Sequence, residues 1–95
     1  MSAYLVFIRE KTIDAAELEI YWSKVRPTFA GHEVRVLASY GYHEDLEGSP
    51  TEGTVIAEFP STEAAKAWYE SPAYREVREH RFKGAIYRGL LVEGL

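Results

Sequence analysis

The sequence contains no cysteine, and this absence excludes several classes of protein. Without cysteine there can be no disulfide bond, no thiolate nucleophile and no cysteine-ligated zinc or iron–sulfur site. No run of about 18 apolar residues occurs, so no membrane-spanning helix is expected. Residues 1–8 also lack the basic segment and the cleavage site of a signal peptide. We therefore expect a cytoplasmic chain that has no membrane partner.

Basic residues are too few for a typical nucleic-acid-binding protein. The 95 residues include 11 Lys and Arg against 15 Asp and Glu, which gives a formal net charge of −4. Affinity for nucleic acid depends on neutralising phosphates, so no such partner is expected. Hydrophobic residues (46%) and aromatic residues (14%) are too abundant for a disordered chain. Because no linker or repeat interrupts the sequence, we expect residues 1–95 to form one domain.

What the sequence does contain is an alternation of strand and helix patterns. β-branched and aromatic residues predict strands over 3–10, 33–42, 54–59 and 85–92. Apolar residues at helical spacing predict a helix after Asp14, with Glu17 completing a capping box and a break near Pro27. Ser61 and the pair Ser71-Pro72 predict the beginnings of two further helices, the second of which ends near residue 82.

The order β-α-β-β-α-β, with the second helix in two parts, is typical of a ferredoxin-like α+β fold. In this fold, helices cover one face of a four-stranded antiparallel sheet. A sheet with one face in water alternates apolar and polar residues, yet the first strand is apolar on both sides: Tyr4, Val6 and Ile8 oppose Leu5 and Phe7. Because the helices can cover only one face, we expect the other face to pair with a second copy of the chain.

Four charged residues are predicted on this second face: Arg9, Arg35, Glu58 and Arg88. If Phe59 packs under the helices, alternation places on the second face Leu5, Phe7, Arg9, Arg35, Leu37, Ser39, Thr54, Ile56, Glu58, Ile86, Arg88 and Leu90. Unpaired buried charge is costly, so these groups must pair or bind a ligand. Two interpretations stay open. In one, a Glu58–Arg88 ion pair fixes the dimer register; in the other, surplus arginine holds a small carboxylate or enolate and Glu58 is a general acid or base.

Three other residues are candidates for the wall or rim of such a pocket. Ser39 lies on the predicted face, Tyr21 could donate a hydrogen bond from its phenol, and His43 follows the second strand. The histidines at positions 32, 43 and 80 are scattered, and none has the spacing of a metal-ligand pair. We expect neither a metal nor a cofactor.

Arginine is concentrated towards the C-terminus. Residues 75–88 contain five basic and two acidic residues, so this segment is positive in an acidic chain. Arg75, Arg78 and Arg81 share one helical stripe. The glutamates interleaved at 76 and 79 favour a solvated, ion-paired helix face over a nucleic-acid-binding stripe.

The most specific motif lies between residues 58 and 74. It reads Glu58-Phe-Pro-Ser-Thr-Glu-Ala-Ala-Lys-Ala-Trp-Tyr-Glu-Ser-Pro-Ala-Tyr74. This segment resembles the signature of a bacterial family catalogued as domain of unknown function 1330, which shows Glu-Phe-Pro-Ser, Glu-Ala-Ala, Ala-Trp-Tyr and Ser-Pro-x-Tyr in this order. The last strand, with its ending Leu91-Val92-Glu93-Gly94, is also similar, so the resemblance covers nearly the whole chain.

The resemblance implies a ferredoxin-like fold whose sheets pair into a dimeric α+β barrel. It implies no settled activity, and the wider superfamily includes cofactor-independent monooxygenases, isomerases, haem-degrading proteins and ligand-sensing domains. Fold analogy is weak evidence for function. The second strand departs from the family pattern, because Ser39-Tyr40-Gly41 stands where an arginine and paired glycines are usual.

Residues and resemblance together predict a small-molecule-binding protein. Its activity would be cofactor-independent proton transfer on a small organic acid or ketone, with Arg88 and Arg35 holding the anion and Glu58 moving the proton. Two alternatives stay open: a dimer that binds or sequesters a ligand without catalysis, and a structural dimer with no open pocket.

Overall fold

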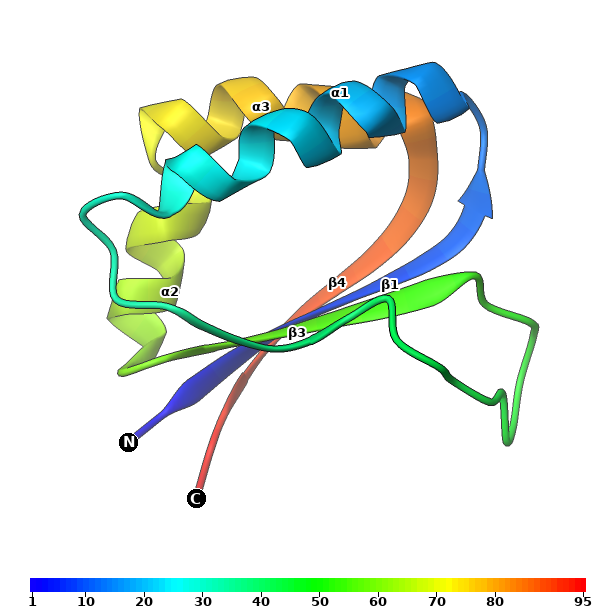
Figure 1. Cartoon of the computed structure of the whole chain (residues 1–95). Coiled ribbons are helices and arrows are strands. Elements are labelled where there is room, and N and C mark those ends of the chain that lie inside the picture. Colours follow the sequence, from blue (N-terminus) through cyan, green and yellow to red (C-terminus); the bar gives the residue numbers. More distant parts are fainter.

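The computed structural model describes residues 1–95 as a two-layer α+β structure (Figure 1). The elements follow in the order β1 (Ala3–Thr12), α1 (Ala15–Val25), the 3-10 helix η1 (Arg26–Phe29), β2 (Arg35–Ser39), β3 (Gly53–Phe59), α2 (Thr62–Tyr69), α3 (Pro72–Gly84) and β4 (Ala85–Glu93). This is the predicted β-α-β-β-α-β order with a divided second helix. The predicted fold class is confirmed.

Each α-helix begins where its capping chemistry predicts. The Asp14 side chain accepts hydrogen bonds from the N–H groups of residues 16 and 17, Ser61 accepts one from residue 64, and Ser71 accepts one from residue 74. Glu17 does not complete the predicted capping box. Its carboxylate instead lies 2.6 Å from Nδ1 of His80, which ties α1 to α3.

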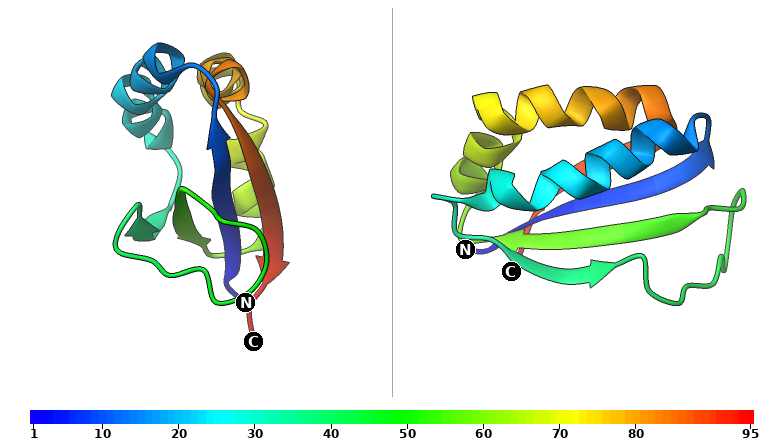
Figure 2. Two further views of the ribbon diagram at one scale, coloured as in Figure 1. Left: turned by 90° about the vertical axis from the view of Figure 1, so that its right-hand side faces the viewer. Right: turned by 45° about the horizontal axis from the view of Figure 1, so that its top comes forward.

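The sheet is antiparallel throughout and has the strand order β2-β3-β1-β4. β1 and β3 are therefore the inner strands, and β2 and β4 are the edges. All three α-helices lie on one side of the sheet, as the right-hand view of Figure 2 shows. None of them combines the length and the hydropathy that a membrane-crossing helix needs.

The strand register assigns the two sheet faces differently from the sequence prediction. Residues that pair laterally share a face, and Leu5 pairs with Ala57. Leu5 and Phe7 are each only 6% exposed and belong to the core with Phe59. The prediction that Leu5, Phe7 and Arg9 face away from the helices is therefore wrong. It failed because β1 is apolar on both sides, so alternation alone cannot show which side the helices cover.

β2 is shorter than the predicted strand over 33–42 and contains an irregularity. Its register with β3 shifts between Val36 and Ala38, so these two residues lie on opposite faces, although the alternation of a regular strand would put them on the same face. Beyond this bulge Ser39 faces the helices, which corrects its predicted place on the other face. Tyr40 then adopts a φ of 55°, a left-handed conformation that few non-glycine residues adopt.

The sheet face away from the helices is apolar at its centre, and we call it the open face. Its members are Tyr4, Val6, Ile8, Arg35, Ala38, Thr54, Ile56, Glu58, Ile86, Arg88, Leu90 and Val92. Leu90 and Val92 are each 51% exposed. A contiguous apolar surface of this kind is unusual on a protein that meets only water.

Candidate functional site

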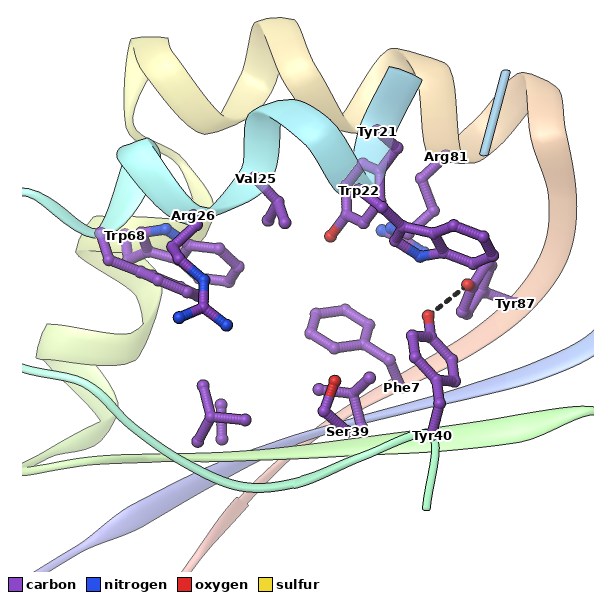
Figure 3. A pocket seen from close by; sticks show the side chains of 14 residues that line it. Phe7, Tyr21, Trp22, Val25, Arg26, Ser39, Tyr40, Trp68, Arg81 and Tyr87 are labelled. Carbon is purple, nitrogen blue, oxygen red and sulfur yellow. Dashed lines mark hydrogen bonds between the residues drawn. The ribbon is translucent and has the colours of Figure 1, made fainter. Parts of the chain in front are cut away.

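A cavity of about 130 Å³ lies between α1 and the sheet, and we call it the α1 cavity (Figure 3). Eleven of its fourteen lining residues are hydrophobic, so it is an apolar space with few polar groups. The lining residues are Phe7, Tyr21, Trp22, Val25, Arg26, Phe29, Val36, Ser39, Tyr40, Val55, Ala57, Trp68, Arg81 and Tyr87. An apolar cavity of about 150 Å³ can hold a benzene molecule, so this volume suits a very small ligand.

Arg81 is the most unusual residue of the cavity wall. Its exposed fraction is 4%, it takes part in none of the ion pairs of the chain, and its Nε atom has no hydrogen-bond partner. A guanidinium is always charged in proteins, and burying an unpaired charge costs several kcal/mol. The cavity therefore has a cationic wall that lacks a counter-ion.

Aromatic rings compensate part of this cost. The Cζ atom of Arg81 lies 4.9 Å from the ring centroid of Phe7 and 5.0 Å from those of Phe82 and Tyr87. A cation over an aromatic face is stabilised by the ring quadrupole. These rings fix the guanidinium in place but cannot neutralise it, so its attraction for an anion remains.

The charge pattern of residues 75–88 predicts a solvated helix stripe that includes Arg81, and that prediction is wrong for Arg81. Arg75 is exposed as predicted, Arg78 is half-buried, and Arg81 is buried. A signal for this burial was present in the sequence. Arg81 follows Tyr74 and Val77 at intervals of seven and four residues, and these three share the buried stripe of α3.

Arg26 supplies a second guanidinium at the other end of the cavity from Arg81 (Figure 3). It lies where α1 passes into η1, because Pro27 ends the regular helix as its sequence position predicts. Arg26 is exposed and forms no ion pair within the chain. No acidic residue lines the cavity, so its lining is positively charged.

Two tyrosine pairs place hydroxyl groups in or beside the cavity. The hydroxyl oxygens of Tyr40 and Tyr87 are 2.5 Å apart, and those of Tyr21 and Tyr74 are 2.8 Å apart. Burial raises the pKa of Tyr21, Tyr74 and Tyr87 above the usual value. These phenols therefore stay protonated at neutral pH and act as hydrogen-bond donors rather than as bases.

Tyr40 is held at one end of the cavity by close packing. Its ring lies against Gly53, where a Cβ atom would come within 2.6 Å of the ring, and Trp22 meets it edge-on at 5.6 Å. The Cζ atom of Arg9 lies 5.0 Å from the Tyr40 ring centroid and 5.4 Å from that of Trp22. Nε of Arg9 also lies 3.2 Å from a carboxylate oxygen of Glu52. This stack links α1 to the sheet.

The structure brings together only some of the residues predicted for the site. Tyr21 and Ser39 line the α1 cavity, and Arg9 packs against two of its wall residues. His43 does not reach the cavity. It lies exposed in the loop before β3, with Nε2 3.2 Å from the carbonyl oxygen of Thr51.

Glu58 and Arg88, predicted as an ion pair, do not meet. Glu58 accepts a hydrogen bond from the Tyr4 hydroxyl at 3.3 Å and lies 4.0 Å from Arg35, whereas Arg88 lies 4.0 Å from Glu10. The two side chains therefore form no ion pair within one chain, and a Glu58–Arg88 pair that fixes the dimer register stays a prediction. Tyr4, Arg35, Glu58 and Arg88 are on the open face, on the opposite side of the sheet from the α1 cavity. No cluster of His, Cys, Asp or Glu in the chain could hold a metal ion.

Two larger depressions are lined by other residues. One of about 380 Å³ lies beside α2 and β4, lined by Tyr69 and Leu91 among others. The other, of about 560 Å³, is lined by Arg35 and Glu58 but not by Arg88. Neither contains a buried charge without a partner, so the α1 cavity is the stronger candidate site.

The fold belongs to the ferredoxin-like class, in which helices cover one face of a four-stranded antiparallel sheet. The chain belongs to the family described as "Domain of unknown function (DUF1330)", which it matches over residues 2–95. The family resemblance noted in the sequence is thus confirmed. No protein with a curated description matches the chain.

Solved structures of the same fold come from several bacteria. A protein of unknown function from Rhodopseudomonas palustris superposes with a TM-score of 0.75 at 20% identity, covering 99% of this chain and 82% of that one. A dimeric ferredoxin-like protein of unknown function from Thermobifida fusca gives 0.67 at 11% identity, with coverage of 99% and 92%. SnoaB, a cofactor-independent oxygenase from Streptomyces nogalater, gives 0.65 at 10%, with coverage of 99% and 93%. At these identities the likeness concerns the fold.

Proposed function

We propose that this chain binds a small organic anion in the α1 cavity. The observation that carries the proposal is the buried guanidinium of Arg81, which has no carboxylate partner and an unpaired Nε. A carboxylate or enolate placed there would supply the missing counter-charge through charge-assisted hydrogen bonds. The aromatic walls would hold the apolar part of the ligand, as in most small-molecule sites.

The cavity supports binding better than the proton transfer expected from the sequence. A general base must lie within hydrogen-bond reach of its substrate, and no carboxylate or imidazole lines the cavity. Glu58, the predicted base, is on the open face. Tyr21 and Tyr87 are protonated donors because burial raises the pKa of each. Of the functions predicted from the sequence, ligand binding without acid–base catalysis therefore fits the geometry best.

A second candidate function is oxidation of a bound enol by dioxygen without a cofactor, in which the CH₂ carbon between two carbonyl groups becomes a third C=O: one oxygen atom of O₂ bonds to that carbon, and the other leaves as water with its two hydrogens. The likeness in fold to a cofactor-independent oxygenase favours it, as does a site that would stabilise an enolate by its cation alone. Oxygen uptake by the protein mixed with 1,3-cyclohexanedione, a cyclic enol, tests this candidate. Uptake that disappears in Arg81→Gln would support it. Absence of any uptake would contradict it.

We further propose that the open face is buried against a second copy of the chain. It presents a row of half-exposed aliphatic side chains, and burying such a surface is a main driving force of association. A fold relative from Thermobifida fusca is described as dimeric. Arg35, Glu58 and Arg88 would then lie inside the interface. Ion pairs between the copies would fix the dimer register, the role that the sequence analysis left open for these residues.

Binding of an anion is tested with a carboxylate and its neutral isostere. Benzoate and benzamide have the same shape, so calorimetric titration of both separates charge recognition from apolar contact. We expect wild type to prefer benzoate and Arg81→Gln to lose that preference, with benzoate binding about tenfold weaker or more because a charged hydrogen bond is lost. Arg75→Gln makes the same charge change at an exposed position of α3 and is the matched control.

Two results would contradict the proposal. One is equal affinity of the wild type for benzoate and benzamide. The other is a benzoate affinity that Arg81→Gln leaves unchanged. Arg81→Lys, which keeps a positive charge, separates loss of charge from loss of folding, because it should retain part of the preference for benzoate.

A further inference from the structure

We infer that the α1 cavity admits an anion built on a single ring, and that Tyr40 is the residue that sets this size limit. The inference rests on the proposed function and names the class of ligand for the same site. Its basis is the packing at the end of the cavity formed by Tyr40, Tyr87 and Trp22 (Figure 3).

The hydrogen-bonded side chains of Tyr40 and Tyr87 extend across the sheet, and we call this pair the bar. Tyr40 directly follows β2, and Tyr87 lies in β4. These strands are the two edges of the sheet, yet the two hydroxyl oxygens are 2.5 Å apart. The two side chains therefore reach towards each other over the inner strands and close the end of the cavity. A ligand that extended in this direction would have to break their hydrogen bond.

The position of Tyr40 depends on specific local structure. Its φ of 55° is in the left-handed region, where a side chain makes the backbone strained. The amide N–H of Tyr40 donates to the carbonyl oxygen of Thr54 at 2.9 Å, and Gly53 leaves room for its ring. Strain that the surroundings maintain is a mark of functional positions. Tyr40 is therefore held by its neighbours in a conformation that its own backbone disfavours.

The remaining space fixes the size of the ligand. A volume of about 130 Å³ is slightly below that of a cavity known to hold benzene. The space continues from the Tyr40 end towards Phe29 and Trp68, whose ring centroids are 5.2 Å apart. One six-membered ring would therefore occupy most of this space with its acidic substituent beside Arg81, whereas a second fused ring would need the space that Tyr40 and Tyr87 occupy.

The same end of the cavity also orients the anion. Two hydroxyl groups that share one hydrogen bond leave a second hydroxyl proton free to donate. Arg81 lies next to this pair, with its Cζ atom 5.0 Å from the Tyr87 ring centroid. The acidic oxygens of the ligand would accept from Arg81 and from the free phenol proton. The ring would then lie against the aromatic residues at the opposite end.

The size limit is tested with benzoate and 2-naphthoate, which share a carboxylate and differ by one fused ring. We expect the wild type to bind benzoate at least about tenfold more tightly than 2-naphthoate. Glycine accepts the positive φ, and Tyr40→Gly removes the bar. This variant should therefore bind 2-naphthoate at least about tenfold more tightly than wild type does. Tyr40→Phe keeps the ring and removes the hydroxyl; it should keep the size limit but weaken benzoate binding several-fold. Tyr42→Gly, at an exposed position two residues away, is the control.

The outcomes separate this inference from the proposed function. If wild type binds both carboxylates equally and Arg81→Gln weakens both, the anion site stands and the size limit is wrong. If Tyr40→Gly is folded by circular dichroism and still rejects 2-naphthoate, Tyr40 does not set the limit. Should Tyr40→Gly be unfolded, a Tyr40→Phe protein that binds 2-naphthoate as well as benzoate contradicts the inference. If wild type binds neither ligand, the proposed function fails and the inference fails with it.

Discussion

Arginines on the two sides of the sheet lie in opposite electrostatic settings. On the open face the side chains of Arg35 and Arg88 are 79% and 66% exposed, and each has a carboxylate at 4.0 Å. Between the helices and the sheet, Arg81 of α3 is 4% exposed and has no carboxylate partner. Solvated pairs cost little and contribute little, whereas an unpaired buried charge is retained at a cost to stability. Surroundings, rather than residue type, therefore distinguish Arg81, which we propose binds a ligand, from the solvated arginines of the open face.

The largest effect should come from placing a charge on the open face. Ile56 lies on this face in the inner strand β3, opposite Val6. In the proposed dimer Ile56→Asp would bury a carboxylate without a partner, which costs several kcal/mol. We expect at least about a hundredfold weaker dimerisation in analytical ultracentrifugation. Ile20→Asp makes the same change on the exposed side of α1 and should leave the dimer intact. A wild-type chain that sediments as a stable monomer would contradict the proposed interface.

A large loss of stability is expected on the helix-covered face. Phe59 is 1% exposed and packs on Trp68 with a ring-centroid distance of 5.8 Å. Phe59→Ala should lower the free energy of unfolding by about 3–5 kcal/mol, because it removes apolar burial and leaves a cavity. Urea denaturation measures the change, and Leu46→Ala in the exposed loop should stay within about 0.5 kcal/mol of wild type. A loss below about 1 kcal/mol would contradict the assignment of Phe59 to the core.

Local features of this fold could be predicted from the sequence, because they depend on neighbours along the chain. Asp14, Ser61 and Ser71 cap helices as their chemistry indicates, and Pro27 ends α1. The element order and the family motif at 58–74 were sufficient to predict the fold class. Each capping signal spans only a few residues, and the family motif lies within one continuous segment.

The site could be predicted only in part, because it depends on contacts between distant strands. The β2 bulge between Val36 and Ala38 places Ser39 on the opposite face from the predicted one, and no turn residue in the sequence indicates a bulge there. Alternation alone puts Arg9 and Glu58 on one face, because the sequence does not reveal the register between β1 and β3. Arg81 could have been found from its spacing to Tyr74, but the interleaved glutamates favoured a solvated reading.

A moderate gain in stability, rather than a loss, is expected when Arg81 is replaced by an apolar residue. Arg81→Met replaces an unpaired buried charge with an apolar side chain, which relieves desolvation and loses the contacts with three rings. We expect the ligand-free protein to gain about 1 kcal/mol in the free energy of unfolding. Arg75→Met, at an exposed position, should change it by less than about 0.5 kcal/mol. A loss of stability in Arg81→Met would instead mark Arg81 as a structural residue.

The smallest effect concerns the buried tyrosine pair. Burial raises the pKa of Tyr21 and of Tyr74 above 10.0 in the folded protein. In the unfolded chain these groups ionise near 10.0, so unfolding releases protons at higher pH and stability falls as the pH rises above about 10. Tyr21→Phe should lower the free energy of unfolding by about 1 kcal/mol at pH 7, because the hydrogen bond is lost. Between pH 8 and pH 10.5, the free energy of unfolding should fall less in this variant than in wild type. Urea titrations at both pH values measure this, and an unchanged alkaline loss would contradict the assignment.

The central claim is that the unpaired guanidinium of Arg81 is the counter-ion of a bound anion, and Nε–H nuclear magnetic resonance tests it most directly. The Arg81 Nε–H, assigned by its absence from the spectrum of Arg81→Gln, has no partner in the ligand-free chain. Saturation with benzoate should shift this resonance. Benzamide at the same concentration should shift it less, and the Nε–H resonance of the exposed Arg75 should not shift. An Arg81 resonance that stays unmoved at saturating benzoate would contradict the account.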